Sequence, residues 1–184
     1  MSKQLHLIQP VGFSLPNILV ALAHDRIDTA TLLHTSEIPE IHIHRAIDIA
    51  NEIRKKDLIP YPTLVKIESP DAESKKQYQS VQDFEISKDS DVVVGVTGGT
   101  QRLVGNLLSR FGTDRLLWVT NEPKVVLKVG SQIWSESLEL TIEDYTRLYG
   151  IAEDTSLFNR AEIDQGRLKV SNHLEISPYP SEGL

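Results

Sequence analysis

The residues best suited to hold an anionic ligand form one short turn, Thr97-Gly98-Gly99-Thr100-Gln101-Arg102. Glycine lets a backbone turn sharply and approach a ligand closely, because it has no side chain. A helix starting here would add unpaired N–H groups and the positive end of its dipole. The hydroxyls, Gln101 and Arg102 could then contact a phosphate or a base. In the alternative interpretation the turn is only a tight connection, and Thr100 caps the helix.

Two further turns have small polar residues that suit the same purpose. Gly12-Phe13-Ser14-Leu15-Pro16-Asn17 lies near the N-terminus, and Ser14 and Asn17 are candidates for contacts to phosphate or ribose. The alternative is that Ser14 caps the following helix and Asn17 faces water. His34-Thr35-Ser36 is the other turn, with Thr35 and Ser36 as candidates. Its alternative is a loop that also caps a helix.

Apolar patterning predicts the elements that position these turns. Strands are expected at residues 5–8, 29–34, 64–67, 91–96 and 114–119, and helices at 16–25, 44–56 and 101–111. The run 91–96 is continuous and rich in valine, which is typical of a parallel strand buried on both faces. Gly130-Ser131 predicts a hairpin between residues 124–129 and 132–136, and residues 141–144 open a helix through residue 148. Residues 166–170 are a further candidate strand.

This order predicts an α/β fold, a Rossmann-like, mainly parallel sheet flanked by helices, with a C-terminal β-hairpin and helix. In such sheets ligands collect at the carboxyl ends of the strands, near the switch in strand order. All three polar turns follow predicted strands and would meet at that edge. Residues 1–150 are expected to form the ligand-binding domain, and residues 151–184 a C-terminal extension or linker.

Composition excludes several classes of function. The 184 residues carry a formal net charge of −7, which disfavours binding to long nucleic acids. The chain has no cysteine, and His42 and His44 lack an evident third ligand, so neither a metal nor another cofactor is expected. The longest apolar stretch, residues 18–23, is far shorter than a membrane span. A cytoplasmic protein is therefore the expectation.

Two of these turns, together with the strands before them, resemble those of a known protein family. The stretch Asp91-Val-Val-Val-Gly-Val-Thr-Gly-Gly-Thr100-Gln-Arg-Leu is similar to the signature of the CRISPR-associated Rossmann fold (CARF) domains. Pro10-Val-Gly-Phe-Ser14-Leu-Pro-Asn17 resembles the first ligand loop of that family. The resemblance covers roughly residues 5–148. It implies a homodimer that binds cyclic oligoadenylate, a second messenger of type III CRISPR antiviral defence, across its axis near the two Thr-Gly-Gly-Thr turns.

One departure from the family bears on catalysis. A lysine often follows Thr-Gly-Gly-Thr in the family and is linked to phosphate contact and ring cleavage, whereas this chain has Gln101, followed by Arg102. Helix geometry points Arg102 about 100° away from Gln101. Ser14, Gln101 and Arg102 are the candidates if the ring is cleaved. The family also attaches effector domains, and residues 151–184 are too few for one, so a fused or associated effector is open.

The residues and the resemblance leave three hypotheses. The first is a dimeric sensor of cyclic oligoadenylate, with cyclic tetra-adenylate as the expected ring. The second is a metal-independent ring nuclease, in which a ribose 2′-OH attacks the neighbouring phosphate and the protein positions the groups and stabilises charge. The third is a Rossmann-like domain that binds an ordinary mononucleotide or serves as a structural partner.

Overall fold

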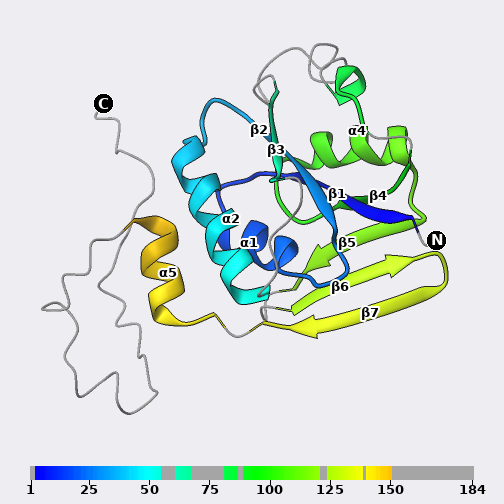
Figure 1. The fold of residues 1–184 in the computed structure, drawn as a ribbon. Helices are drawn as coiled ribbons and strands as arrows, with labels where there is room; N and C mark the ends of the chain where they lie inside the picture. Colours follow the sequence, from blue (N-terminus) through cyan, green and yellow to red (C-terminus); the bar gives the residue numbers. More distant parts are fainter. Residues whose placement is uncertain are drawn as a thin grey trace, which may run out of the picture. The chain divides into compact units, whose positions relative to one another are not determined.

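The computed structural model describes residues 3–54, 61–67, 81–86, 89–120, 124–138 and 140–150. Strands and helices alternate along the first part of the chain (Figure 1). The strands are β1 (Gln4–Pro10), β2 (Thr29–His34), β3 (Thr63–Lys66), β4 (Ser90–Gly95), β5 (Arg115–Val119), β6 (Lys124–Val129) and β7 (Gln132–Ser137). The helices are α1 (Leu15–Leu22), α2 (Glu40–Arg54), α4 (Gln101–Phe111) and α5 (Ile142–Tyr149).

The strands form one seven-stranded sheet in the order β3-β2-β1-β4-β5-β6-β7. Strands β1 to β5 pair in parallel, and β6 and β7 continue the sheet as an antiparallel hairpin beside β5. This confirms the predicted Rossmann-like α/β fold with its hairpin and terminal helix. The chain runs outward from β1 to β3 and then returns to place β4 on the other side of β1. The switch in strand order therefore lies between β1 and β4, which both precede glycine-containing turns.

Alternate side chains of the central strands enter two apolar clusters, one on each face of the sheet. Leu7, Val93 and Leu117 pack with the helices α1, α2 and α5. Ile8 and Val94 pack on the opposite face with Leu103 and Leu107 of α4. The period of two along a strand gives this division. Burial on both faces explains why the central strands are continuously apolar.

Helix α2 begins at Glu40, four residues earlier than the sequence pattern predicted. Ile43 is fully buried and starts the apolar stripe that Ala46, Ile47 and Ala50 continue, so the additional turn gains packing. His42 and His44 consequently lie on one helix. The predicted strand at residues 166–170 and the extension 151–184 lie outside the described residues, so these expectations remain predictions.

Candidate ligand-binding site

The turns that follow β1 and β4 pack directly against each other. A Cβ atom added at Gly12 would lie 2.8 Å from the backbone nitrogen of Gly99, and one at Gly98 would lie 2.6 Å from the carbonyl oxygen of Pro10. Both distances are shorter than real Cβ contacts. Gly98 and Gly99 also have φ angles of 114° and 64°, which glycine adopts far more easily than other residues. The glycines therefore bring two loops together, a role that the sequence did not indicate.

The side chain of Gln9 connects these two loops through hydrogen bonds. This side chain is buried, and its Nε2 donates hydrogen bonds to the carbonyl oxygens of Pro10, at 3.0 Å, and of Thr97. Gly95 leaves the space that the Gln9 amide occupies, because a Cβ there would lie 1.9 Å from its Oε1. The buried Gln9 thus links the end of β1 to the turn after β4.

A hollow of about 340 Å³ opens on the side of these loops that faces α1. It is lined by residues from the start of α1, the turn after β4, the end of β5 and α5, namely Ser14, Pro16, Asn17, Val20, Thr97, Val119, Thr120 and Tyr145. This volume lies near the lower limit of small-molecule pockets, which is roughly 300 Å³. The hollow can accept a group about the size of one nucleoside.

A smaller hollow of about 130 Å³ lies between the ends of β1 and β2 and the start of α4. Its lining residues are Val11, Gly12, Phe13, Thr35, Glu37, Ile38, Gly99, Thr100 and Leu103. Phe13 stands at this hollow with 67% of its side chain exposed. The three predicted polar turns therefore do meet at the carboxyl edge of the sheet, where both hollows are found.

The hydroxyl groups of the three turns have different roles. Thr100 caps α4, because its Oγ1 accepts a hydrogen bond of 3.2 Å from the Leu103 N–H. The Thr97 Oγ1 accepts one of 2.9 Å from the Val119 N–H and joins β4 to β5. Ser14, in contrast, makes no capping hydrogen bond with its side chain although it stands at the N-cap of α1. The capping alternative is right for Thr100 and wrong for Ser14.

Gln101 and Arg102 form the first turn of α4 and are both exposed. Neither lines one of the two hollows, and Ser36, also exposed, lines neither. Thr100 occupies the Leu103 N–H, whereas the N–H groups of a helix's first residues have no partner within the helix. The start of α4 therefore presents backbone donors next to the smaller hollow, which Thr100 and Leu103 line, and this arrangement suits a phosphate.

The sequence did not indicate several of the residues that line the larger hollow. Tyr145, Val119 and Thr120 come from α5 and the end of β5, where the sequence has no glycine-rich turn to mark a site. Gln9, a glutamine within an apolar strand, is a signal that could have been noticed. Across the described ranges no three His, Asp or Glu side chains are grouped to hold a metal ion. Nor does any helix in that part of the chain have the length and apolarity to cross a membrane.

Comparisons with known proteins add a structural likeness. No protein-family model matches the sequence, and no curated protein matches it either. The solved structure of Can2 from Sulfobacillus thermosulfidooxidans in complex with cyclic tetra-adenylate is similar, with a TM-score of 0.57 and 14% identity over 79% of this chain and 41% of that chain. Csm6 of Enterococcus italicus bound to cyclic hexa-2′-fluoro-hexa-dAMP has a TM-score of 0.50 and 15% identity, over 80% of this chain and 38% of that one.

A third similar structure is a type III CRISPR defence DNA nuclease activated by cyclic oligoadenylate. Its TM-score is 0.50, with 17% identity over 78% of this chain and 23% of that one. This chain thus spans about two fifths of the length of Can2 and of Csm6, and about a quarter of the length of the DNA nuclease. At sequence identities of 14–17%, the structural likeness shows a shared fold and nothing more. The chain has a Rossmann-like α/β fold similar to that of these three solved structures, which confirms the fold predicted from the sequence.

Proposed function

We propose that this chain is a dimeric sensor domain that binds cyclic oligoadenylate, with cyclic tetra-adenylate as its ring, in type III CRISPR antiviral signalling in the cytoplasm. The observation that carries the proposal is the meeting of the turns after β1 and β4 at the switch in strand order, with hollows on both sides. The fold likeness to Can2 in complex with cyclic tetra-adenylate supports the same ligand class.

The chemistry of this edge suits a ligand with alternating phosphates and nucleosides. Backbone N–H groups at the start of α4 and the Arg102 guanidinium can hold a phosphate, although the whole chain carries a net charge of −7. Ser14 and Asn17 line the hollow of about 340 Å³ with polar groups for a ribose or base. Binding would then switch a fused or associated effector domain.

The experiment that tests the proposal is a binding titration with labelled cyclic tetra-adenylate. Ser14→Ala and Asn17→Ala should each weaken binding about fivefold or more, since each removes a hydrogen-bonding group from the hollow. Ser109→Ala is the control, because Ser109 is exposed near the opposite end of α4. If the natural chain binds no ring at micromolar protein, the proposal is wrong. Equal affinities of all three variants would remove this hollow from the site.

The Ser14 hydroxyl also favours a second function, a ring nuclease, because it lines the larger hollow without capping α1. In this reaction a ribose 2′-hydroxyl attacks the adjacent phosphorus and gives up its proton to solvent, the bond from phosphorus to the 5′-oxygen breaks, and the 5′-oxygen gains a proton from solvent. The products are a 2′,3′-cyclic phosphate and a 5′-hydroxyl. Linear products that disappear in Ser14→Ala would support the nuclease, whereas an intact ring after prolonged incubation would support the sensor alone.

A further inference from the structure

One aromatic side chain stands at the larger hollow, and it comes from a helix outside the three polar turns. Tyr145 of α5 lines the hollow together with Asn17 of α1 and Val119 at the end of β5. Its side chain is 40% exposed, so part of the ring remains available to a ligand. A tyrosine that lines a hollow and is partly open to solvent can offer aromatic surface to a ligand.

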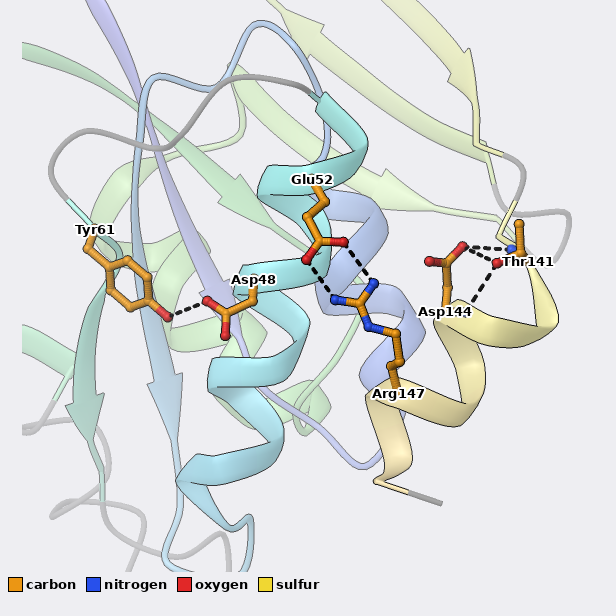
Figure 2. A network of polar contacts seen from close by, with 6 residues as sticks. All are labelled: Asp48, Glu52, Tyr61, Thr141, Asp144 and Arg147. Atoms are coloured by element: carbon orange, nitrogen blue, oxygen red, sulfur yellow. Dashed lines mark hydrogen bonds and ion pairs between the residues drawn. The ribbon is translucent and has the colours of Figure 1, made fainter. Parts of the chain in front are cut away.

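Helix α5 is held firmly, which fixes the position of Tyr145. Leu148 is fully buried in the cluster that contains α1 and α2. At the start of the helix Thr141 and Asp144 form a capping box, in which the Asp144 N–H donates to Thr141 and the Thr141 N–H donates to the Asp144 carboxylate. Figure 2 shows this box beside the contact between Arg147 and Glu52 of α2.

The contact between Arg147 and Glu52 is a bidentate ion pair. The two terminal nitrogens of Arg147 donate to the two carboxylate oxygens of Glu52, at 2.7 and 2.6 Å. Such paired hydrogen bonds fix orientation as well as distance. Because Tyr145 lies between the capping box and Arg147 in the sequence, the packed and capped helix holds its backbone in place before any ligand arrives.

The remaining walls of the hollow suit a flat heterocyclic ring with polar edges. Pro16, Val20 and Val119 contribute apolar surface, and Asn17 contributes a side-chain amide. Among the described residues no hydrogen bond to that amide is found. An amide can donate to one atom of an adenine edge and accept from its amino group at the same time. Aromatic faces stack on bases with little regard to sequence, so the amide supplies the selection.

We propose that this hollow is an adenine subsite in which the Tyr145 ring stacks on the base and the Asn17 amide pairs with its edge. The inference rests on the proposed function, because it names the part of the site that receives one base of the cyclic oligoadenylate. Tyr145 is thereby the base-stacking residue of the site, contributed by α5, and Asn17 is the residue that selects adenine.

The test uses the full chain and a cyclic tetra-adenylate in which 8-vinyladenine replaces all four adenines, since this base keeps N7 and the 6-amino group of adenine and its fluorescence falls when it stacks on an aromatic ring. Tyr145→Ala should weaken binding about fivefold or more and abolish the quenching. Tyr145→Phe should retain both, because phenylalanine keeps the aromatic face. Tyr149→Ala is the matched control, since Tyr149 lies on the same helix with 43% exposure and does not line the hollow.

The outcomes separate this inference from the proposed function. If the natural chain binds no ring, the proposed function fails and the subsite with it. If the natural chain binds but Tyr145→Ala has the affinity and quenching of Tyr149→Ala, the subsite is wrong while the sensor stands. Unfolding curves that match the natural chain show that a loss in Tyr145→Ala does not come from misfolding.

Discussion

At the residue scale, the backbone of the site depends on glycines whose side-chain positions are occupied by a neighbouring loop. Gly98→Ala should destabilise the fold by about 1–3 kcal/mol, because its Cβ would meet the Pro10 carbonyl oxygen at a φ of 114°. Gly105→Ala is the control. Gly105 lies in α4 with open space around it, so this change should stabilise by about 0.5–1 kcal/mol. Urea unfolding of both variants checks the signs, and equal effects would contradict the account.

The neutral side chain of Gln101 limits how much charge at the first turn of α4 contributes to binding of the ring. Gln101→Lys should tighten binding of cyclic tetra-adenylate by up to about fivefold, since an exposed charge contributes up to about 1 kcal/mol. The gain should shrink at high salt, which screens exposed charges, and any slow ring cleavage should become faster. Dissociation constants at two salt concentrations give the measurement. Gln132→Lys, an exposed position on β7, controls for net charge and should change little.

Single residues show how far sequence reasoning reaches at this scale. The capping role of Thr100 follows from its place before an apolar helical stripe, and the hydrogen bond from the Leu103 N–H to the Thr100 hydroxyl confirms it. Tyr145 could not be found in the same way, because its position at the hollow depends on where α5 packs rather than on its neighbours in sequence. The glycines were recognised correctly as turn residues, yet their contact with a second loop is a tertiary property that no local pattern encodes.

At the element scale, α5 is attached to α2 through the pair of Glu52 and Arg147 (Figure 2). Hydrogen bonds from Arg147 lower the pKa of Glu52 below its ordinary value, and the same bonds raise the pKa of Arg147. Both side chains are more than a third exposed, so the coupling free energy should be only about 0.2–1 kcal/mol. A double-mutant cycle of Glu52→Gln and Arg147→Gln measures it by urea unfolding at neutral pH.

The same pair predicts a pH dependence with a definite sign. Since the pKa of Glu52 is depressed in the folded chain, its contribution is complete above the unfolded value of about 4.3 and is lost as the pH falls through the lower folded value. The coupling should therefore vanish in a cycle measured below that range. A coupling that persists unchanged in acid would show that the contact stabilises through packing of the side chains rather than through charge.

Element boundaries show what patterning leaves undecided. Helix α4 occupies the predicted residues 101–111, because Thr100 caps its start and Gly112 ends it. Helix α2 extends to Glu40, where no strong capping residue marks the start and burial of Ile43 decides the length. A helix boundary that depends on a capping residue can therefore be predicted from the local sequence, whereas a boundary that depends on tertiary packing cannot.

At the scale of the whole molecule, the alternation of strands and helices predicts a mainly parallel sheet, while the order of the strands must be observed. The position of β4 beside β1 creates the switch in strand order and brings the turns at Gly12 and Gly98 into contact. The sequence supplies two similar turns, but only long-range pairing makes them neighbours. The turns of the site could be predicted from the sequence, whereas the lining residues from α5 and the end of β5 could not.

A symmetric ring predicts a symmetric assembly at this scale. The chain should form a homodimer whose two-fold axis passes near the two Thr-Gly-Gly-Thr turns, because an isologous interface presents the same groups to both halves of the ring. Sedimentation equilibrium at micromolar protein should give twice the mass of one chain. A single-chain mass both with and without cyclic tetra-adenylate would contradict the dimer.

The central claim is that the chain binds an intact cyclic oligoadenylate, and the most direct test is a calorimetric titration with cyclic tetra-adenylate followed by analysis of the ligand recovered. The account predicts saturable binding of one ring by two chains, with the ring recovered uncleaved, because the neutral Gln101 amide stabilises the charge that develops on a phosphate less than a lysine would. Absence of binding would contradict the account altogether. Rapid multiple-turnover conversion to linear products would contradict the sensor and establish the ring nuclease in its place.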